Sequence, residues 1–110
     1  METAMIKKYT DYRASLVNNA TKKKLKILKI CLDLYQSMGI VRVGYIYDLY
    51  NKNGKKLSRQ YINETLRLLE SDGLIQKIDW GIYRVNVIKA KNVLMLFRKL
   101  IEILGGKLDV

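Results

Sequence analysis

The chain has 110 residues, 49% of them hydrophobic, which suits one domain with one core. Lysine and arginine number 21 against 10 acidic residues, and this formal net charge of +11 favours a polyanionic partner such as nucleic acid. Histidine is absent and Cys31 is the single cysteine, which excludes an intramolecular disulfide and a thiolate zinc cluster and removes the commonest general base and metal ligand.

The first predicted element is a short amphipathic helix over residues 3–18. Asn18, Asn19 and Ala20 interrupt its pattern, and Thr21 is suited to cap the helix that follows. The apolar positions of this first helix are Met5, Tyr9, Tyr12 and Leu16, with Ile6 and Val17 beside them.

Residues 22–38 carry the clearest helical pattern, and Gly39 is expected to end the helix. Its apolar face is wide, which predicts burial against more than one other element. Cys31 lies on that face, so we expect a buried structural thiol. The apolar positions are Leu25, Leu28, Leu32 and Tyr35, with Ile27, Cys31, Leu34 and Met38 forming the adjacent stripe.

Two shorter elements and a loop follow. Residues 40–43 are short and β-branched, which predicts a small strand. Apolar residues at positions i, i+3 and i+4 predict a second helix of about two turns over 44–51. Residues 51–56 contain turn-forming residues and three lysines, and are expected to form a polar loop.

A third helix is predicted to start at Ser58, which has the side chain of an N-cap. Gly73 suits the left-handed position that follows a helix, so the helix should stop just before it. Its predicted buried seam consists of Ile62, Leu66 and Leu69.

After Gly73 the sequence period changes from helix to strand, and a tight β-hairpin is predicted from strands over 74–79 and 82–88. Trp80 lies in the turn between the strands. We favour packing of Trp80 against the core or against a partner subunit, with stacking on a DNA backbone as the alternative. The residues expected on one face of the second strand are Tyr83, Val85 and Val87.

Residues 90–104 predict a closing helix that carries more apolar surface than one surface helix needs. We expect this surface to pair with a second copy in a homodimer. The alternative is that the terminal helices fold back on their own core. The residues predicted at the dimer interface are Val93, Phe97, Leu100 and Leu104.

Residues 22–88 resemble a winged helix-turn-helix domain. The likeness is carried mainly by residues 57–75, where a polar helical turn leads to a Leu-Leu-Glu-x-x-Gly-Leu-Ile ending, and by the returning strand Ile82-Tyr83-Arg84-Val85. A closer likeness covers residues 43–75, which are similar to the winged-helix domain of archaeal origin-recognition initiators. Since the chain has no ATPase domain or glycine-rich phosphate motif, the resemblance implies a DNA-binding module rather than an initiator.

The resemblance implies an α+β, mostly helical fold, in which a winged helix-turn-helix core carries extra N- and C-terminal helices. The corresponding division of the chain is an N-terminal helix in residues 1–20, a winged helix-turn-helix domain in residues 21–88, and a C-terminal helix and tail in residues 89–110.

The third helix has the side chains that base recognition needs. Arginine suits guanine, and glutamine or asparagine suits adenine, through paired hydrogen bonds in the major groove. Any surface helix can carry such residues, so a solvated face is the alternative. Glu64 lies near the same face, where it would accept from cytosine, pair with a basic neighbour or remain solvated. The predicted base contacts are Ser58, Arg59, Gln60, Asn63 and Arg67.

Basic residues around this helix are candidates for contacts to the DNA backbone. Lys77 and Arg84 flank the tip of the hairpin and are placed to meet phosphates or a minor groove. For any single lysine, a solvated surface is the alternative. The predicted backbone and wing contacts are Lys52, Lys55, Lys56, Lys77, Trp80 and Arg84.

The expected function is sequence-specific binding of double-stranded DNA, in a transcriptional regulator that acts by promoter occlusion or recruitment. The alternatives are a DNA-binding role in replication or plasmid partition, or a winged-helix module for protein contacts. No carboxylate pair or nucleophile–base pair stands out, so no enzymatic activity, cofactor or small-molecule ligand is expected.

No segment has the length of apolar sequence that a membrane span needs, and the N-terminus lacks the apolar core of a secretion signal. A cytoplasmic location is therefore expected. The absence of proline and the many Lys, Ile, Leu and Tyr residues favour an archaeal or archaeal-virus origin.

Overall fold

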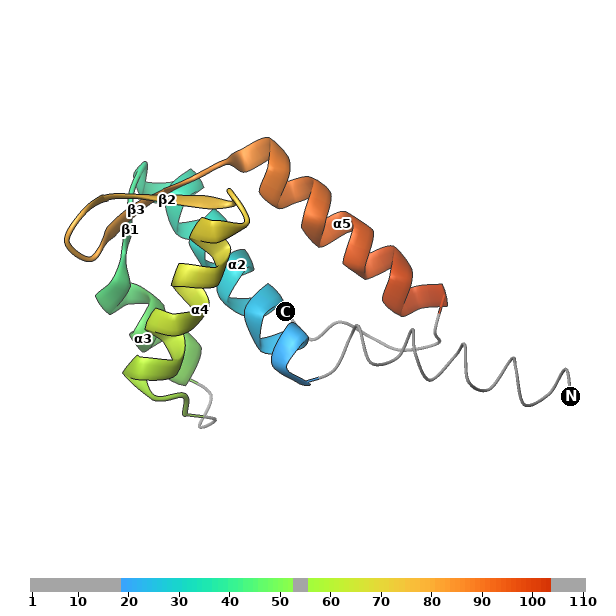
Figure 1. The fold of residues 1–110 in the computed structure, drawn as a ribbon, viewed down its shortest axis with the longest axis horizontal. Helices are drawn as coiled ribbons and strands as arrows, with labels where there is room; N and C mark the ends of the chain where they lie inside the picture. Colours follow the sequence, from blue (N-terminus) through green and yellow to red (C-terminus); the bar gives the residue numbers. More distant parts are fainter. Residues whose placement is uncertain (1–18, 53–55, 104–110) are drawn as a thin grey trace, which may run out of the picture.

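A computed structural model describes residues 19–52 and 56–103 of the chain. These residues form an α+β, mostly helical fold with four helices and one three-stranded antiparallel sheet (Figure 1). The helix predicted over residues 3–18, together with Lys55 and Leu104, lies outside the described residues.

Helix α2 (Asn19–Met38) supplies the largest share of the core. Asn19 and Ala20 belong to α2 rather than interrupting the helical pattern as predicted, since neither residue stops a helix and alanine has the best helix propensity. Thr21 therefore lies inside α2, and the prediction that it caps the helix is wrong. Gly39 follows the helix with a φ of +78°, which confirms the predicted end.

The sheet has the strand order β1–β3–β2. Strand β1 (Val41–Arg42) pairs with one edge of β3 (Ile82–Val85), and β2 (Ile75–Asp79) pairs with the other. The hairpin turn closes at Gly81, whose φ of +67° favours glycine. The Gly81 carbonyl accepts a hydrogen bond of 2.9 Å from the Val43 N–H. The hairpin turn is therefore bonded to the first residue of the helix that follows β1.

Helices α3 (Val43–Asn51) and α4 (Arg59–Ser71) lie on the same side of the molecule as the hairpin (Figure 1). Ser58 caps α4 by accepting a hydrogen bond of 3.1 Å from the Tyr61 N–H, as predicted. Asn51 ends α3, and its side-chain oxygen accepts from the Leu57 N–H at 2.9 Å. This bond joins the two ends of the connecting loop.

The core forms where α2, α3, α4 and the sheet meet. The predicted seam of α4 is confirmed, since Ile62, Leu66 and Leu69 are all buried. The Cys31 thiol is fully buried, also as predicted, and this burial raises its pKa to about 12. The other members of the core cluster are Ile27, Leu28, Leu32, Leu34, Val41, Ile46, Tyr50, Leu74, Ile75, Val85 and Ala90.

Helix α5 (Val87–Ile103) closes the described chain and lies on the opposite side of the molecule from the hairpin turn (Figure 1). It starts three residues earlier than predicted because Asn86 caps it. The Asn86 side-chain oxygen accepts from the Lys89 N–H at 3.2 Å, and the Asn86 carbonyl accepts from the Ala90 N–H. Val87 therefore belongs to α5, and the prediction that it shares a strand face with Tyr83 and Val85 is wrong.

Candidate nucleic-acid interface

One side of α4 carries a stripe of exposed polar residues beside α3. Arg59, Asn63 and Arg67 follow one another at intervals of four residues, and all three are exposed. Because this spacing keeps side chains on one face of a helix, the three groups form a single row next to the buried seam. Gln60 is also exposed, one step further round the helix.

Tyr47 of α3 holds two residues of this row. Its hydroxyl donates a hydrogen bond of 2.7 Å to Oδ1 of Asn63, and the Arg59 guanidinium lies over its ring at 5.2 Å from the ring centre. The asparagine keeps its amide N–H groups free to donate, and its oxygen has a second lone pair. Sequence reasoning missed Tyr47, because the contact joins positions 16 residues apart on two helices.

Gln60 is held by a neighbour on the same helix. Its side-chain amide donates to the Glu64 carboxylate at 3.3 Å, so this carboxylate is directed toward Gln60. The Ser58 hydroxyl is committed to the α4 N-terminus as its cap. Of the five predicted base contacts, Arg59, Gln60, Asn63 and Arg67 share the exposed surface of α4, and Ser58 lies at the start of this surface.

The hairpin tip presents an aromatic ring and a cation together. Trp80 is 87% exposed, and the Lys77 ammonium lies 4.2 Å from the centre of a Trp80 ring. The prediction that Trp80 packs against the core of its own chain is therefore wrong: the turn that ends β2 places its side chain outside the fold. An exposed tryptophan with a lysine over it is a surface on which a sugar or base can stack.

The remaining basic residues of the prediction are spread around this side. The Arg84 Nε donates to the Gln76 side-chain oxygen at 2.6 Å across the hairpin, which fixes the direction of the guanidinium. Lys52 and Lys56 are exposed at the two described ends of the α3–α4 loop. Two lysines of α2 lie over rings of α3 and α4, with Lys26 over Tyr50 and Lys23 over Tyr61, contacts that the sequence did not reveal.

The electrostatics near the sheet tie α4 to the hairpin. The Glu70 carboxylate accepts from the Lys77 N–H at 2.8 Å, so one acidic side chain of α4 binds the backbone of β2. Burial, and to a lesser degree Glu70, raises the pKa of Tyr83, while the charge of Arg67 lowers it. The Glu70 carboxylate therefore links the C-terminal part of α4 to the hairpin.

No family model, curated protein or solved structure matches this chain. Within residues 19–52 and 56–103, no cluster of three or more acidic, cysteine or histidine residues is placed to hold a metal ion, and none of the helices has the length and apolarity to cross a bilayer.

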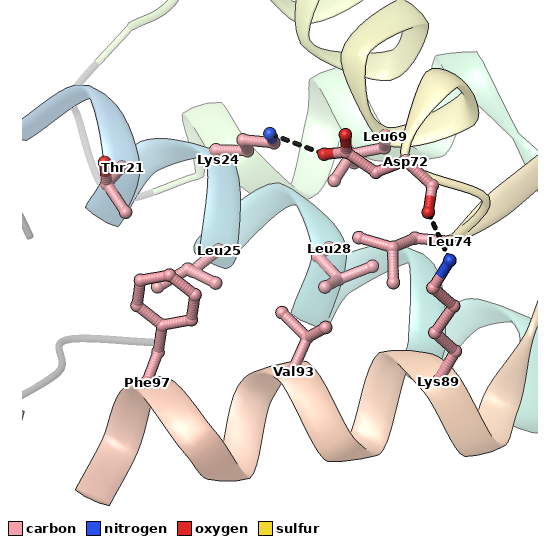
Figure 2. A pocket seen from close by; sticks show the side chains of 10 residues that line it. All are labelled: Thr21, Lys24, Leu25, Leu28, Leu69, Asp72, Leu74, Lys89, Val93 and Phe97. Atoms are coloured by element: carbon pink, nitrogen blue, oxygen red, sulfur yellow. Dashed lines mark hydrogen bonds and ion pairs between the residues drawn. The ribbon is translucent and has the colours of Figure 1, made fainter. Parts of the chain in front are cut away.

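Of the four predicted dimer residues, the three that the structure describes lie on the inner side of α5. Val93 packs against the core of its own chain, and Val93 and Phe97 both face α2 (Figure 2). Leu100 is half-buried. For these positions the structure supports the alternative in which the closing helix folds back on its own core. The exposed apolar side chains of α5 are instead Ile88, Met95, Leu96 and Ile103.

Proposed function

We propose that this chain is a winged helix-turn-helix protein that binds double-stranded DNA in a sequence-specific manner, and that it acts as a transcriptional regulator. In this proposal α3 and α4 are the helix-turn-helix, α4 is the recognition helix, and the β2–β3 hairpin is the wing. The element order α2–β1–α3–α4–β2–β3 and the strand order β1–β3–β2 support it.

The observation that carries the proposal is the row Arg59, Asn63 and Arg67 on the exposed side of α4. The major groove admits one helix, and its bases are read by side chains of this kind from the first turns. Tyr47 holds Asn63 in place before any DNA arrives. A solvated helix needs no such support, whereas a reading helix gains specificity from it.

The wing and the loop supply the backbone contacts of the proposal. Lys77 and Trp80 at the hairpin tip are placed to meet a phosphate and a sugar or base beside the major groove. The net charge of +11 supports the same partner, because each neutralised phosphate releases a condensed counterion.

The test is selection of bound sequences from random duplex DNA, followed by titration of the selected site at several salt concentrations. With roughly six to ten phosphate contacts, affinity should fall by ~10³-fold or more between 50 and 200 mM salt. Arg59→Ala should lose on the order of 1–3 kcal/mol on the selected site and relax the preference for one base pair.

Lys56→Ala is the matched charge control within the interface, and it should weaken all duplexes nearly equally. Lys91→Ala, on the exposed side of α5, should change neither affinity nor preference. A salt-independent interaction, or a selection that returns no preferred sequence, would contradict the proposal and favour a module for protein contacts.

A further inference from the structure

A cavity of about 360 Å³ lies between α2, the end of α4 and α5, on the side of the fold away from the hairpin turn (Figures 1 and 2). This volume falls within the range of ~300–1,000 Å³ that small-molecule sites occupy. The walls are mostly apolar and come from all three helices and the turn after α4. The apolar residues are Leu25, Leu28, Leu69, Leu74, Val93 and Phe97.

The polar residues that line the cavity are Thr21, two lysines and one aspartate, which together form its rim. The Lys24 ammonium forms an ion pair of 2.8 Å with the Asp72 carboxylate. The Lys89 ammonium donates instead to the Asp72 backbone carbonyl at 2.6 Å (Figure 2). Within the described part of the chain, Lys89 therefore forms no ion pair, and the rim carries one more positive charge than negative.

Lys89 has a structural role at this point. Asp72 is the C-cap of α4, so the lysine binds a carbonyl at the negative end of the helix dipole. Gly73 makes room for it, since a Cβ there would lie 2.9 Å from the Lys89 Nζ. This clamp between α5 and α4 does not require an apolar cavity beside it, and protein interiors have few voids larger than a water molecule.

We propose that this cavity binds a small amphipathic carboxylate. Its apolar body lies along Leu28, Val93 and Phe97, and its carboxylate binds the Lys89 ammonium. The ligand supplies the negative charge that the rim lacks, and its carboxylate forms an ion pair with an ammonium that otherwise donates to a neutral carbonyl. An uncharged analogue of equal size would keep only the apolar contacts.

Occupancy of the cavity reaches α4, because the ligand carboxylate binds the same ammonium that donates to the Asp72 carbonyl, through another of its three N–H groups. The ligand thereby becomes part of the contact that fastens α5 to the C-terminal end of α4. This consequence rests on the proposed function, in which α4 reads DNA, and it makes the carboxylate an effector of DNA binding. Ligand binding itself does not depend on that function.

The experiment is isothermal titration of octanoate and of octan-1-ol into the purified full-length protein, without DNA. Octanoate should bind saturably at one site, and octan-1-ol should bind at least ten-fold more weakly. Lys89→Gln should lower octanoate affinity to that of the alcohol and leave the alcohol unchanged. The matched control Lys91→Gln, on the exposed side of the same helix, should leave both affinities unchanged.

A second variant, Val93→Phe, narrows the cavity and should weaken both ligands, with urea unfolding used to verify that the variant folds. The proposal is overturned if octanoate shows no saturable binding, if Lys89→Gln and Lys91→Gln have equal effects, or if Val93→Phe leaves both affinities unchanged. A titration of the selected DNA site with and without octanoate is a separate measurement. Octanoate binding without any DNA binding would retain the cavity and reject the proposed function.

Discussion

Tyr47 of α3 contacts two side chains of the exposed row on α4, Asn63 and Arg59. The Tyr47→Phe substitution keeps the ring under Arg59 and removes only the hydroxyl that binds Asn63. We expect this change to weaken the selected DNA site by about 0.5–1.5 kcal/mol, the net worth of one hydrogen bond, with no change in salt dependence. Titrations of the selected duplex and of a scrambled duplex measure the effect.

Tyr45→Phe is the control, because Tyr45 is an exposed tyrosine on the same helix. It should bind both duplexes as the unchanged protein does. An equal loss on the selected and scrambled duplexes in Tyr47→Phe would show that the hydroxyl supports the fold of α3 and α4 rather than the reading of bases.

Cys31 makes stability depend on pH at the alkaline end. Burial raises its pKa from 9.0 to about 12, so the folded protein retains a proton that the unfolded chain loses above pH 9. The stabilising effect is fully present below pH 9 and is lost as the pH rises toward 12, by up to about 4 kcal/mol. Urea unfolding of the protein and of Cys31→Ala between pH 8 and about pH 11 tests this, since only the difference between their slopes belongs to the thiol. Parallel pH profiles would contradict it.

At the scale of elements, the start of α5 depends on one side chain. Asn86→Ala removes the oxygen that accepts from the Lys89 N–H, and we expect a loss of about 1 kcal/mol in the free energy of unfolding. Asn92→Ala is the matched control: Asn92 is exposed inside the same helix, where alanine has the higher helix propensity. Urea unfolding measures both, and equal effects would mean that Asn86 is not a cap.

The elements differ in how well the sequence predicted them. Helix α4 was predicted correctly at both ends, because Ser58 and Gly73 are strong start and stop residues. The start of α5 was predicted three residues too late, and the interruption predicted at Asn19 and Ala20 is not seen in the described part of α2. For α5 a cap was available in Asn86, but Val87 and Ile88 continue the β-branched pattern of β3 and favoured a longer strand.

Single residues of the candidate interface were predictable, but contacts between them were not. Residues on α4 follow from helical spacing, and four of them share the exposed surface as expected. Lys77 and Trp80 were also predicted as wing residues. The contact between these two and the contribution of Tyr47 from α3 need the direction of a turn and the packing of α3, which a linear pattern does not contain. The cavity was missed for the same reason, since its walls come from three helices and the turn after α4.

For the whole molecule, the outer side of α5 leaves an apolar surface to be covered. Ile88, Met95, Leu96 and Ile103 are all more than half exposed, and burying such side chains gains ~25 cal/mol for each Å² of apolar area. We expect a second copy to cover this surface in a two-fold homodimer.

Light scattering at micromolar concentration tests the dimer. The expected mass is twice the chain mass of 12.8 kDa, and Leu96→Glu should return it to the monomer value. Lys52→Glu, an exposed charge reversal at the end of α3, should leave the dimer intact. A mass near 12.8 kDa for the unchanged protein would rule out the homodimer.

The hydrogen bond from the Val43 N–H to the Gly81 carbonyl has a consequence for the rate at which a partner is captured. It joins the hairpin turn to α3, and Glu70 joins β2 to α4, so the two helices and the hairpin are already arranged as one body in the free protein. Ordering of these segments is then complete before an encounter. Association should therefore be limited by diffusion and long-range charge attraction rather than by a slow rearrangement, and its rate should rise steeply as salt is lowered.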